Sequence, residues 1–552
     1  MENLKPTAAN SSPLTPIAFL VRAATVYGDC VSIVYNETKF TWSETLDRCR
    51  RVASSISSMG IRRGDVVSVL SPNVPAMYEL QFAVPMAGAV LNSINTRLDA
   101  RTVAVLVKHS GAKLLFVDCL LRSLAIEALS MLDVKKKPAM VLIGDVYESE
   151  KVNALTDEFV GMYEDLVERG DLRFEWLLPE SEWDPIVLNY TSGTTSAPKG
   201  VVHCHRGTFL MTVDSLIEWS VPKQAVYLWT LAMFHANGWC FPWGIAAVGG
   251  VNICVRKFDA AVIYDLIEKH GVNHMCGAPV VLNMLSNWEK SRPLKKPVKI
   301  MTAGAPPPAA VLFKTDELGF VVSHGYGLTE TAGLVVTCAW KPKWNRLPAS
   351  EQARLKSRQG VPTYCLSKID VINPVTGGSV PRDGASVGEV VLRGGSLMLG
   401  YLKDPESTAK AIINGWFFTG DVGVMHEDGY LEIKDRSKDV IISGGENVSS
   451  VEIESALFTH PSVDEAAVVA RPDEFWGETP CAFVSLKKGG LKKPPSDKEL
   501  MEYCREMMPH FMVPKTVVFV EELPKTSTGK VQKFVLREMA KKIGPNQQRS
   551  RI

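Results

Sequence analysis

Short apolar segments alternate with amphipathic segments in the first part of the chain, and this alternation restricts the fold most strongly. The tetrapeptide at 41–44 (Thr-Trp-Ser-Glu) has the pattern of a helix capping box, and apolar side chains then recur at helical spacing up to Gly60. Residues 66–70 and 113–117 are apolar runs typical of buried strands, and another helix is predicted to begin near Pro75. Strands that alternate with helices in this way predict an α/β fold built of layers.

The sequence pattern changes from about Lys368, where short strand-like segments are separated by turns that contain glycine. This change predicts a β-rich subdomain. The charged run at 434–439 (Lys-Asp-Arg-Ser-Lys-Asp) then precedes a new apolar segment and predicts a domain boundary. We therefore predict an α/β protein with a large N-terminal domain, residues 1–434, of layered α/β subdomains plus the β-rich subdomain. A small α+β C-terminal domain, residues 435–552, is predicted to hold helices at 451–459 and 497–508 and strands at 466–470, 481–486 and 516–520.

Charge and cysteine usage argue against several classes of function. The chain has 61 lysines and arginines against 60 aspartates and glutamates, so no basic excess indicates binding to nucleic acid or an anionic membrane. The 11 cysteines are scattered singly, which argues against a disulfide framework or a zinc site and fits a reducing compartment. His203 and His205 lie two residues apart, but no further ligands follow at suitable spacing. We expect polar structural roles for both.

Targeting signals are sparse in the sequence. The N-terminus lacks the basic, apolar and cleavable sections of a secretory signal. Residues 239–255 are uncharged, but proline and glycine interrupt them, so they predict buried strands and turns rather than a membrane span. The last three residues, Ser550, Arg551 and Ile552, resemble a Ser-Lys-Leu peroxisomal address. They predict recognition by a peroxisomal import receptor, and without such recognition we expect a cytoplasmic protein.

Residues 191–200 (Thr-Ser-Gly-Thr-Thr-Ser-Ala-Pro-Lys-Gly), here called the hydroxyl loop, directly follow a predicted buried strand at 186–190. Glycine allows the backbone to approach a ligand closely, hydroxyl and amide groups donate hydrogen bonds, and lysine supplies positive charge. The loop does not match the Gly-x-x-x-x-Gly-Lys-Ser/Thr pattern of a P-loop. It predicts a polyphosphate-binding loop, with an ordinary polar surface loop as the alternative.

Further motifs follow the hydroxyl loop along the chain. They read Gly-Tyr-Gly-Leu-Thr-Glu at 325–330, Trp-Phe-Phe-Thr-Gly-Asp at 416–421, Asp-Arg-Ser-Lys-Asp at 435–439 and Leu-Pro-Lys-Thr-Ser-Thr-Gly-Lys-Val-Gln-Lys at 523–533. Together and in this order, the motifs resemble the acyl-adenylate-forming superfamily, which includes acyl-CoA synthetases, aryl-CoA ligases, luciferases and peptide-synthetase adenylation domains. Ser-Gly-Gly-Glu-Asn at 443–447 and Tyr-Thr-Ser-Gly-Thr-Thr-Ser at 190–196 are most similar to plant peroxisomal-type short-chain, medium-chain or aromatic acyl-activating enzymes.

The resemblance implies a reaction in two steps. A carboxylate attacks the α-phosphate of ATP to give acyl-AMP and pyrophosphate, and the thiolate of coenzyme A then displaces AMP to give a thioester. The hydroxyl loop would hold the β- and γ-phosphates, with Lys199 supplying a charge. Glu330 would bind Mg²⁺, which prefers carboxylate and phosphate oxygens. Thr329 would contact the α-phosphate, and Tyr326 would stack on adenine; taken singly, Glu330 would suit a solvated helix start and Tyr326 a packing position.

The resemblance also implies roles for residues near the domain junction and beyond it. Asp421 would accept both ribose hydroxyls, and Arg436 would support the same ribose. Lys530 would stabilise the negative charge that builds up during adenylation. Lys438 aligns with the hinge of a mobile small domain, and the region of Gly444 and Gly445 would approach the coenzyme A thiol. The candidate cofactor-binding residues are Thr191, Ser192, Gly193, Thr194, Thr195, Lys199, Gly304, Ala305, Pro306, Gly325, Tyr326, Gly327, Thr329, Asp421, Arg436, Lys438, Gly444, Gly445 and Lys530; the candidate catalytic residues are Lys530, His235 and Thr329; the candidate metal ligand is Glu330.

Three positions bear on the substrate acid and on departures from the family pattern. His235 stands where amino-acid-activating relatives have an aspartate, which argues against an amino-acid substrate. Gly327 stands where acetate-specialised relatives have tryptophan, which predicts space for several more carbons or a ring. Ser196 replaces the commonest glycine, as in the plant group, and we do not expect it to inactivate the protein. The residues that either line the acyl pocket or pack in the core are Trp239, Val335, Val336 and Cys338.

We predict an ATP- and Mg²⁺-dependent carboxylate–CoA ligase for a small-to-medium hydrophobic acid: short, branched, medium-chain or aromatic. A luciferase-like adenylating oxygenase and a stand-alone adenylation module that loads a carrier protein are the alternatives of similar chemistry. The carrier-loading alternative is disfavoured because no carrier domain is appended and His235 replaces the aspartate. A nucleotide-binding regulator without turnover is a different class, and the presence of Glu330, Asp421, Arg436 and Lys530 argues against it. The acid, the pathway and the oligomeric state stay open.

Overall fold

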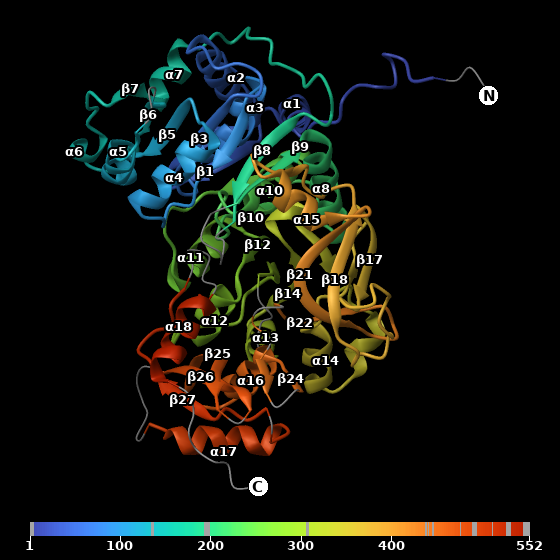
Figure 1. The fold of residues 1–552 in the computed structure, drawn as a ribbon. Coiled ribbons are helices and arrows are strands. Elements are labelled where there is room, and N and C mark those ends of the chain that lie inside the picture. The colour runs from blue at the N-terminus through green and yellow to red at the C-terminus, as the bar shows by residue number, and fades with distance from the viewer. Residues whose placement is uncertain are drawn as a thin grey trace.

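The computed structural model describes residues 5–133, 137–191, 199–304, 309–436, 439, 441–443, 446–474, 476–487, 494–510, 512–525 and 531–544. Within these ranges, the strands form two large sheets of nine and eight strands and two smaller sheets of five strands each. Figure 1 shows the small antiparallel sheet, in orange, at one side of the large sheets and the C-terminal unit, in red, at their lower end. The predicted α/β class and its layered subdomains are confirmed.

The eight-stranded sheet carries the strands on either side of the hydroxyl loop. Its order is β19-β9-β8-β4-β3-β5-β6-β7, and β9 is antiparallel to β8. Its strands are β3 (Val66–Leu70), β4 (Val90–Ser93), β5 (Leu114–Asp118), β6 (Ala139–Ile143), β7 (Phe159–Met162), β8 (Pro185–Tyr190), β9 (Gly200–Cys204) and β19 (Gly400–Tyr401). The hydroxyl loop therefore connects two adjacent strands near one edge of this sheet, where β19 is the outermost strand.

Helices predicted from the sequence pack beside these strands. Helix α2 (Trp42–Ser58) begins with the predicted capping box, in which Thr41 Oγ1 accepts from the Glu44 amide at 3.3 Å and Glu44 Oε2 accepts from the Thr41 amide at 2.7 Å. These bonds satisfy amides that a helix start leaves without partners. The other helices of this part are α1 (Ala18–Tyr27), α3 (Pro75–Met86), α4 (Ala100–Ser110), α5 (Arg122–Ser130), α6 (Glu150–Asn153), α7 (Tyr163–Arg169) and α8 (His205–Glu218).

The nine-stranded sheet is parallel in its central part, and the motif at 325–330 lies at the carboxyl end of one of its strands. Its order is β16-β15-β14-β13-β12-β10-β11-β1-β2. Its strands are β1 (Val31–Tyr35), β2 (Thr38–Thr41), β10 (Val226–Leu228), β11 (Val251–Ile253), β12 (His274–Gly277), β13 (Val298–Thr302), β14 (Phe320–Gly327), β15 (Leu334–Thr337) and β16 (Val361–Pro362). Ligands of open α/β sheets bind outside the carboxyl ends of the strands.

Short helical segments connect the strands of the nine-stranded sheet. They are α9 (Ala236–Trp239), α10 (Phe241–Ala247), α11 (Ala260–His270), α12 (Pro279–Asn287), α13 (Ala309–Glu317), α14 (Ala349–Lys356) and the 3₁₀ turn η2 (Thr329–Thr331). The prediction of strands and turns over 239–255 is partly wrong, because α10 occupies much of this segment and only β11 is a strand. Pro242 lies in the first turn of α10, where its missing N–H removes no helical hydrogen bond. No helix within the described ranges is long and apolar enough to cross a membrane.

The β-rich subdomain predicted after Lys368 is present as an antiparallel sheet. Its strands are β17 (Leu366–Ile372), β18 (Gly388–Gly394), β20 (Ile412–Ile413), β21 (Trp416–Met425) and β22 (Leu431–Arg436), and α15 (Pro405–Ala411) precedes β20. Strand β21 brings Asp421 to the carboxyl edge of the nine-stranded sheet, because its side chain bonds to β14 there.

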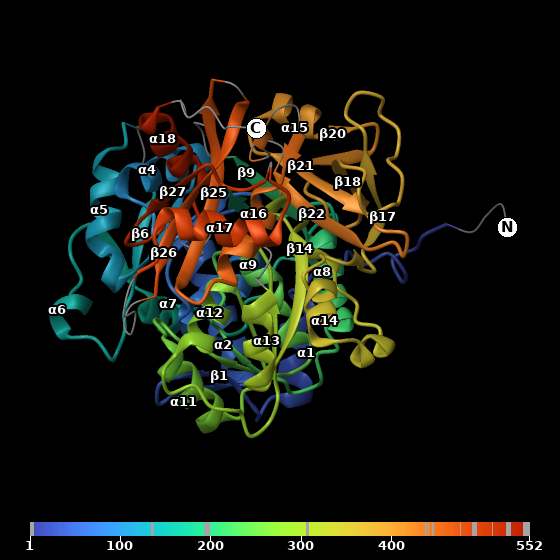
Figure 2. The same cartoon turned by 90° about the horizontal axis from the view of Figure 1, so that it is seen from below.

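The C-terminal unit is α+β, as predicted. Its strands are β23 (Ile441–Ser443), β24 (Glu446–Val448), β25 (Val463–Asp473), β26 (Gly477–Leu486) and β27 (Thr516–Phe519), and its helices are α16 (Ser450–Phe458), α17 (Asp497–Met507) and α18 (Lys533–Ile543). Figure 2, seen from below, shows this unit in front of the large sheets. The domain boundary between 434 and 435 and the mobility of the small domain stay predictions.

Candidate functional site

The predicted adenine and ribose residues lie together at the carboxyl end of β14. Tyr326 Oη donates a hydrogen bond of 2.6 Å to Asp421 Oδ2, and both side chains are buried. The Asp421 amide also donates to Thr419 Oγ1 at 3.0 Å. In the register of β21 and β22, Arg436 pairs with Asp421. The structure therefore brings one aromatic ring, one carboxylate and the backbone of Arg436 to a single point, although they come from three strands.

The predicted metal ligand and the predicted phosphate-binding lysine meet at a residue that the sequence motifs do not include. Tyr401 Oη donates to Glu330 Oε1 at 2.9 Å, and Lys199 Nζ lies 4.7 Å from the centroid of the Tyr401 ring. Burial and the negative charge of Glu330 raise the pKa of Tyr401, so its hydroxyl stays protonated and donates. The pairing of β19 with β9 places Tyr401 beside Lys199, and this pairing leaves no local signal in the sequence.

The backbone of Thr329 is fixed by a buried histidine. His203 Nε2 donates to the Thr329 carbonyl oxygen at 2.7 Å. Burial lowers the pKa of His203 to about 4, so its ring is neutral at physiological pH. No group of side chains in the described part of the chain could hold a metal ion through three or more His, Cys, Asp or Glu residues. The expected polar structural role of His203 agrees with this contact.

The glycines of the site have different steric roles. Gly304 follows β13 with φ of 92°, a conformation that glycine adopts without strain. A Cβ added to Gly327 would lie 2.0 Å from the carbonyl oxygen of Gly333, and one added to Gly325 would lie 3.0 Å from Leu334 Cδ1. A side chain at position 327 would therefore meet backbone, and the idea that Gly327 leaves space for the acid stays a prediction.

A small apolar cavity lies beside β15, and Trp239 is one of the residues that line it. Its volume of about 10 Å³ is close to that of one water-sized sphere. Its lining residues are Ser215, Glu218, Trp239, Phe241, Met301, Leu334 and Thr337. Val335 and Val336 are fully buried among core side chains, and Cys338 Sγ donates to the Leu355 carbonyl at 3.3 Å. Of the four predicted lining residues, Trp239 is the one that borders this cavity.

His235 is half-buried and precedes a turn of left-handed backbone. Residues 236–240 have φ values from 39° to 66°, and four of the five carry a side chain. Left-handed backbone costs about 1–2 kcal/mol per residue that has a Cβ. Buried amide side chains around this turn, among them Asn237 and Gln81, were not identified from the sequence. The dipeptide of Asn237 and Gly238 is the signal that could have indicated a turn there.

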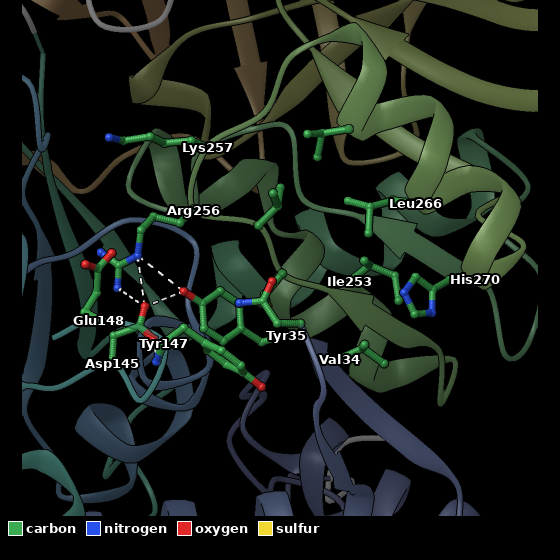
Figure 3. Close-up of a pocket in the computed structure, with 14 residues that line it drawn as sticks. Val34, Tyr35, Asp145, Tyr147, Glu148, Ile253, Arg256, Lys257, Leu266 and His270 are labelled. Atoms are coloured by element: carbon green, nitrogen blue, oxygen red, sulfur yellow. Dashed lines mark hydrogen bonds and ion pairs between the residues drawn. The ribbon is translucent and has the colours of Figure 1, made fainter.

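A second and larger cavity of about 310 Å³ lies at the carboxyl ends of β1 and β11, on the same edge of the nine-stranded sheet. Figure 3 shows Tyr35, Asp145 and Arg256 bonded to one another along one side of it. Tyr35 Oη donates to Asp145 Oδ2 at 2.5 Å, and Arg256 binds Asp145 and Asp118 at 2.6 Å each. Asp118 ends β5 of the eight-stranded sheet, so Arg256 ties the two large sheets together with both carboxylates buried.

Other sequence-predicted site residues lie outside the described residues, and their roles stay predictions. They are Ser192, Gly193, Thr194, Thr195, Ala305, Pro306, Lys438, Gly444, Gly445 and Lys530. Thr191 is described at the start of the hydroxyl loop, where its amide donates to the Lys199 carbonyl at 3.1 Å. This bond closes the base of the loop.

Comparisons with known proteins agree with the motifs. A sequence model described as AMP-binding enzyme matches residues 20–402, and one described as AMP-binding enzyme C-terminal domain matches residues 452–530. The chain is 69% identical over 546 residues to 2-methylpropanoate–CoA ligase CCL4 of Humulus lupulus, covering 99% of this chain and 98% of the relative. It is also 69% identical over 547 residues to probable acyl-activating enzyme 5, peroxisomal, of Arabidopsis thaliana, covering 99% of each.

Solved structures share the fold over nearly the whole chain. The anthranilate CoA ligase AuaEII in complex with anthranoyl-AMP superposes with a TM-score of 0.83 at 22% identity, covering 97% of this chain and 99% of that chain. ATP-bound MatB from Rhodopseudomonas palustris superposes with a TM-score of 0.81 at 25% identity, covering 96% of this chain and 99% of that chain. The family models and the two plant relatives confirm the resemblance inferred from the motifs, and the solved structures show the same fold.

Proposed function

Because the chain belongs to the AMP-binding enzyme family, we propose that it is an ATP-dependent carboxylate–CoA ligase. In the first step, a carboxylate oxygen of the substrate acid attacks the α-phosphorus of ATP and pyrophosphate leaves. In the second step, the thiolate sulfur of coenzyme A attacks the acyl carbon and AMP leaves, which gives the acyl-CoA thioester. The names of the two plant relatives, one a CoA ligase and one an acyl-activating enzyme, support this proposal.

The observation that carries the proposal is the pairing of Tyr326 with Asp421 at one end of a site whose other end holds Glu330, Tyr401 and Lys199. A buried carboxylate beside an aromatic ring suits a nucleoside, because it accepts hydrogen bonds from ribose hydroxyls. A lysine at the end of the hydroxyl loop suits the polyphosphate. ATP is a ligand that has both a nucleoside and a polyphosphate.

The residues present fit a magnesium ion, which takes oxygen ligands. Glu330 would hold it through its carboxylate, and the ion would neutralise charge on the phosphates when bound. The hydroxyl group of Tyr401 orients that carboxylate by its hydrogen bond at 2.9 Å. Lys199 stays near the phosphates through its contact with the same ring.

The C-terminal unit would complete the site through Lys530. An ammonium group placed near the α-phosphate stabilises the negative charge that develops during the first step. A swing of the small domain about Lys438 would then bring Gly444 and Gly445 near the coenzyme A thiol. Such hinge motion exchanges the groups that face one site between the two half-reactions.

For the substrate we propose a short branched acid of the size of 2-methylpropanoate. The relative that is 69% identical is named as a ligase of that acid. We further propose import into the peroxisome through Ser550, Arg551 and Ile552, since one plant relative is named peroxisomal.

A panel of acids tests the proposed function. Purified protein is mixed with ATP, Mg²⁺, coenzyme A and one of propanoate, 2-methylpropanoate, hexanoate or benzoate, and acyl-CoA and AMP are measured by mass spectrometry. We expect equal amounts of the two products, with the highest rate for 2-methylpropanoate. The Lys530→Ala variant should lose the first step. Absence of acyl-CoA with every acid would rule out the ligase function.

A further inference from the structure

A left-handed turn separates His235 from the apolar cavity. Its five residues, 236–240, all have positive φ, and one of them, Gly238, is glycine. Residues with a Cβ rarely adopt this conformation in succession. Such backbone persists where the surrounding structure over-determines it, and these sites are often functional. Contacts with the surrounding structure must therefore hold the turn in this conformation.

A chain of three buried amide side chains holds the turn. Asn237 Nδ2 donates to Gln81 Oε1 at 2.8 Å, and Asn189 Nδ2 donates to Asn237 Oδ1 at 2.6 Å. Each of the three residues is at most 3% exposed. A buried amide that loses its partners pays the cost of desolvation. The two hydrogen bonds therefore favour the left-handed turn over conformations that would point Asn237 elsewhere.

The amide chain joins elements that meet at the site. Gln81 lies in α3, Asn189 lies in β8 two residues before the hydroxyl loop begins at Thr191, and Asn237 follows His235 by two residues. The other side of the turn is closed as well, since a Cβ on Gly238 would lie 2.7 Å from Trp229 Cζ3. The turn is thus fixed against the strand that leads into the hydroxyl loop.

We propose that Asn237 and Gln81 are positioning residues that set which acids the site accepts. They act through the turn, which carries His235 at one end and Trp239, a wall of the apolar cavity, at the other. Without the amide chain, His235 and Trp239 are no longer held in one place, so the site distinguishes the compact acid from larger acids less sharply. The nucleotide end, at Tyr326 and Asp421, lies on β14 and β21, whereas Gln81 and Asn189 lie on α3 and β8. This inference rests on the proposed ligase function.

The variant Asn237→Gly separates the amide from the backbone conformation, because glycine adopts positive φ without steric cost. The matched control is Asn414→Gly, since Asn414 has φ of 51° and is exposed. For Asn237→Gly we expect kcat/KM for 2-methylpropanoate to fall about 10-fold, while that for hexanoate changes less, and KM for ATP to stay within about 2-fold of wild type. Asn414→Gly should match wild type in all three.

A second variant, Gln81→Met, removes the partner of Asn237 at similar side-chain length. It should reduce the ratio of kcat/KM for 2-methylpropanoate to that for hexanoate in the same way. The double variant should reduce this ratio little further, because both changes break one network. If one of the two variants fails to fold, the acid preference of the other still tests the proposal. An unchanged acid preference in the folded variants would overturn the proposal. Failure of the ligase function is a different result, in which the wild-type protein itself forms no acyl-CoA and both proposals fall.

Discussion

Tyr401 shows how one side chain organises two charged groups of the site. Its hydroxyl group donates to Glu330, and its ring face contacts the Lys199 ammonium group. The sequence did not reveal Tyr401 because its role depends on the pairing of β19 with β9, two strands almost 200 residues apart in the chain. Tyr326 and Asp421, by contrast, were predicted from their motifs, and the structure places them in contact.

The variant Tyr401→Phe keeps the ring beneath Lys199 and removes the hydrogen bond to Glu330. A hydrogen bond to a charged group contributes about 1.5–3 kcal/mol, so we expect kcat/KM for MgATP to fall by about 10-fold or more. In thermal unfolding with ATP present, the variant should also need a higher Mg²⁺ concentration than the wild type to reach half of the maximal stabilisation. Tyr364→Phe is the control, because Tyr364 is 72% exposed. Equal Mg²⁺ dependence in both variants would contradict the role of Tyr401.

At the scale of single elements, local sequence signals succeeded where one short segment determines the structure. The capping box that starts α2 is an example, since all its partners lie within four residues. The prediction for residues 239–255 was partly wrong, because proline and glycine also fit a helix when proline lies in its first turn. The left-handed turn at 236–240 was missed because tertiary hydrogen bonds from α3 and β8 stabilise it. Such contacts are not visible in local patterns.

The junction of β14 with β15 yields a prediction about Gly327. Gly327→Ala should destabilise the fold by about 1–3 kcal/mol, because the added methyl group meets the Gly333 carbonyl oxygen. The relative rates with different acids should change little. Gly378→Ala is the control, since the nearest atom to its Cβ would be Thr376 Oγ1 at 3.7 Å. Thermal unfolding and the acid panel check both points. A stable Gly327→Ala protein with a shifted acid preference would show that this position faces the acid after all.

At the scale of the whole molecule, the two large sheets are joined by the buried cluster of Arg256 with Asp118 and Asp145. The class and layering of the fold were predictable from the alternation of strands and helices. This pairing between sheets was not, because Arg256 lies more than 100 residues from either carboxylate in the chain. We expect Arg256→Met to cost about 3–5 kcal/mol in free energy of unfolding, since two buried carboxylates lose their cation. Lys269→Met breaks an exposed pair with Glu37 and should leave the free energy of unfolding nearly unchanged. Comparable losses in the two variants would contradict the buried role of Arg256.

Buried histidines give the molecule a defined response to acid. Burial lowers the pKa of His203, His205, His274 and His324 to about 4, below the usual value near 6.5. The unfolded chain therefore binds protons that the folded chain does not as the pH falls from about 6.5 to 4. The free energy of unfolding should decrease over this range and be unaffected by these groups above it. Urea titrations at a series of pH values give the free energy of unfolding at each pH. This free energy should fall less steeply with decreasing pH in His324→Gln than in the wild type. An equally steep fall would mean that His324 titrates normally in the folded protein.

Exchange of labelled pyrophosphate into ATP, measured without coenzyme A, tests whether the protein forms acyl-AMP. A ligase that forms acyl-AMP first runs this step backwards, so exchange should require the acid, be fastest with 2-methylpropanoate and need no coenzyme A. Thioester and AMP should appear together once coenzyme A is added. Formation of acyl-CoA with release of ADP and phosphate, and no acid-dependent exchange, would contradict formation of acyl-AMP.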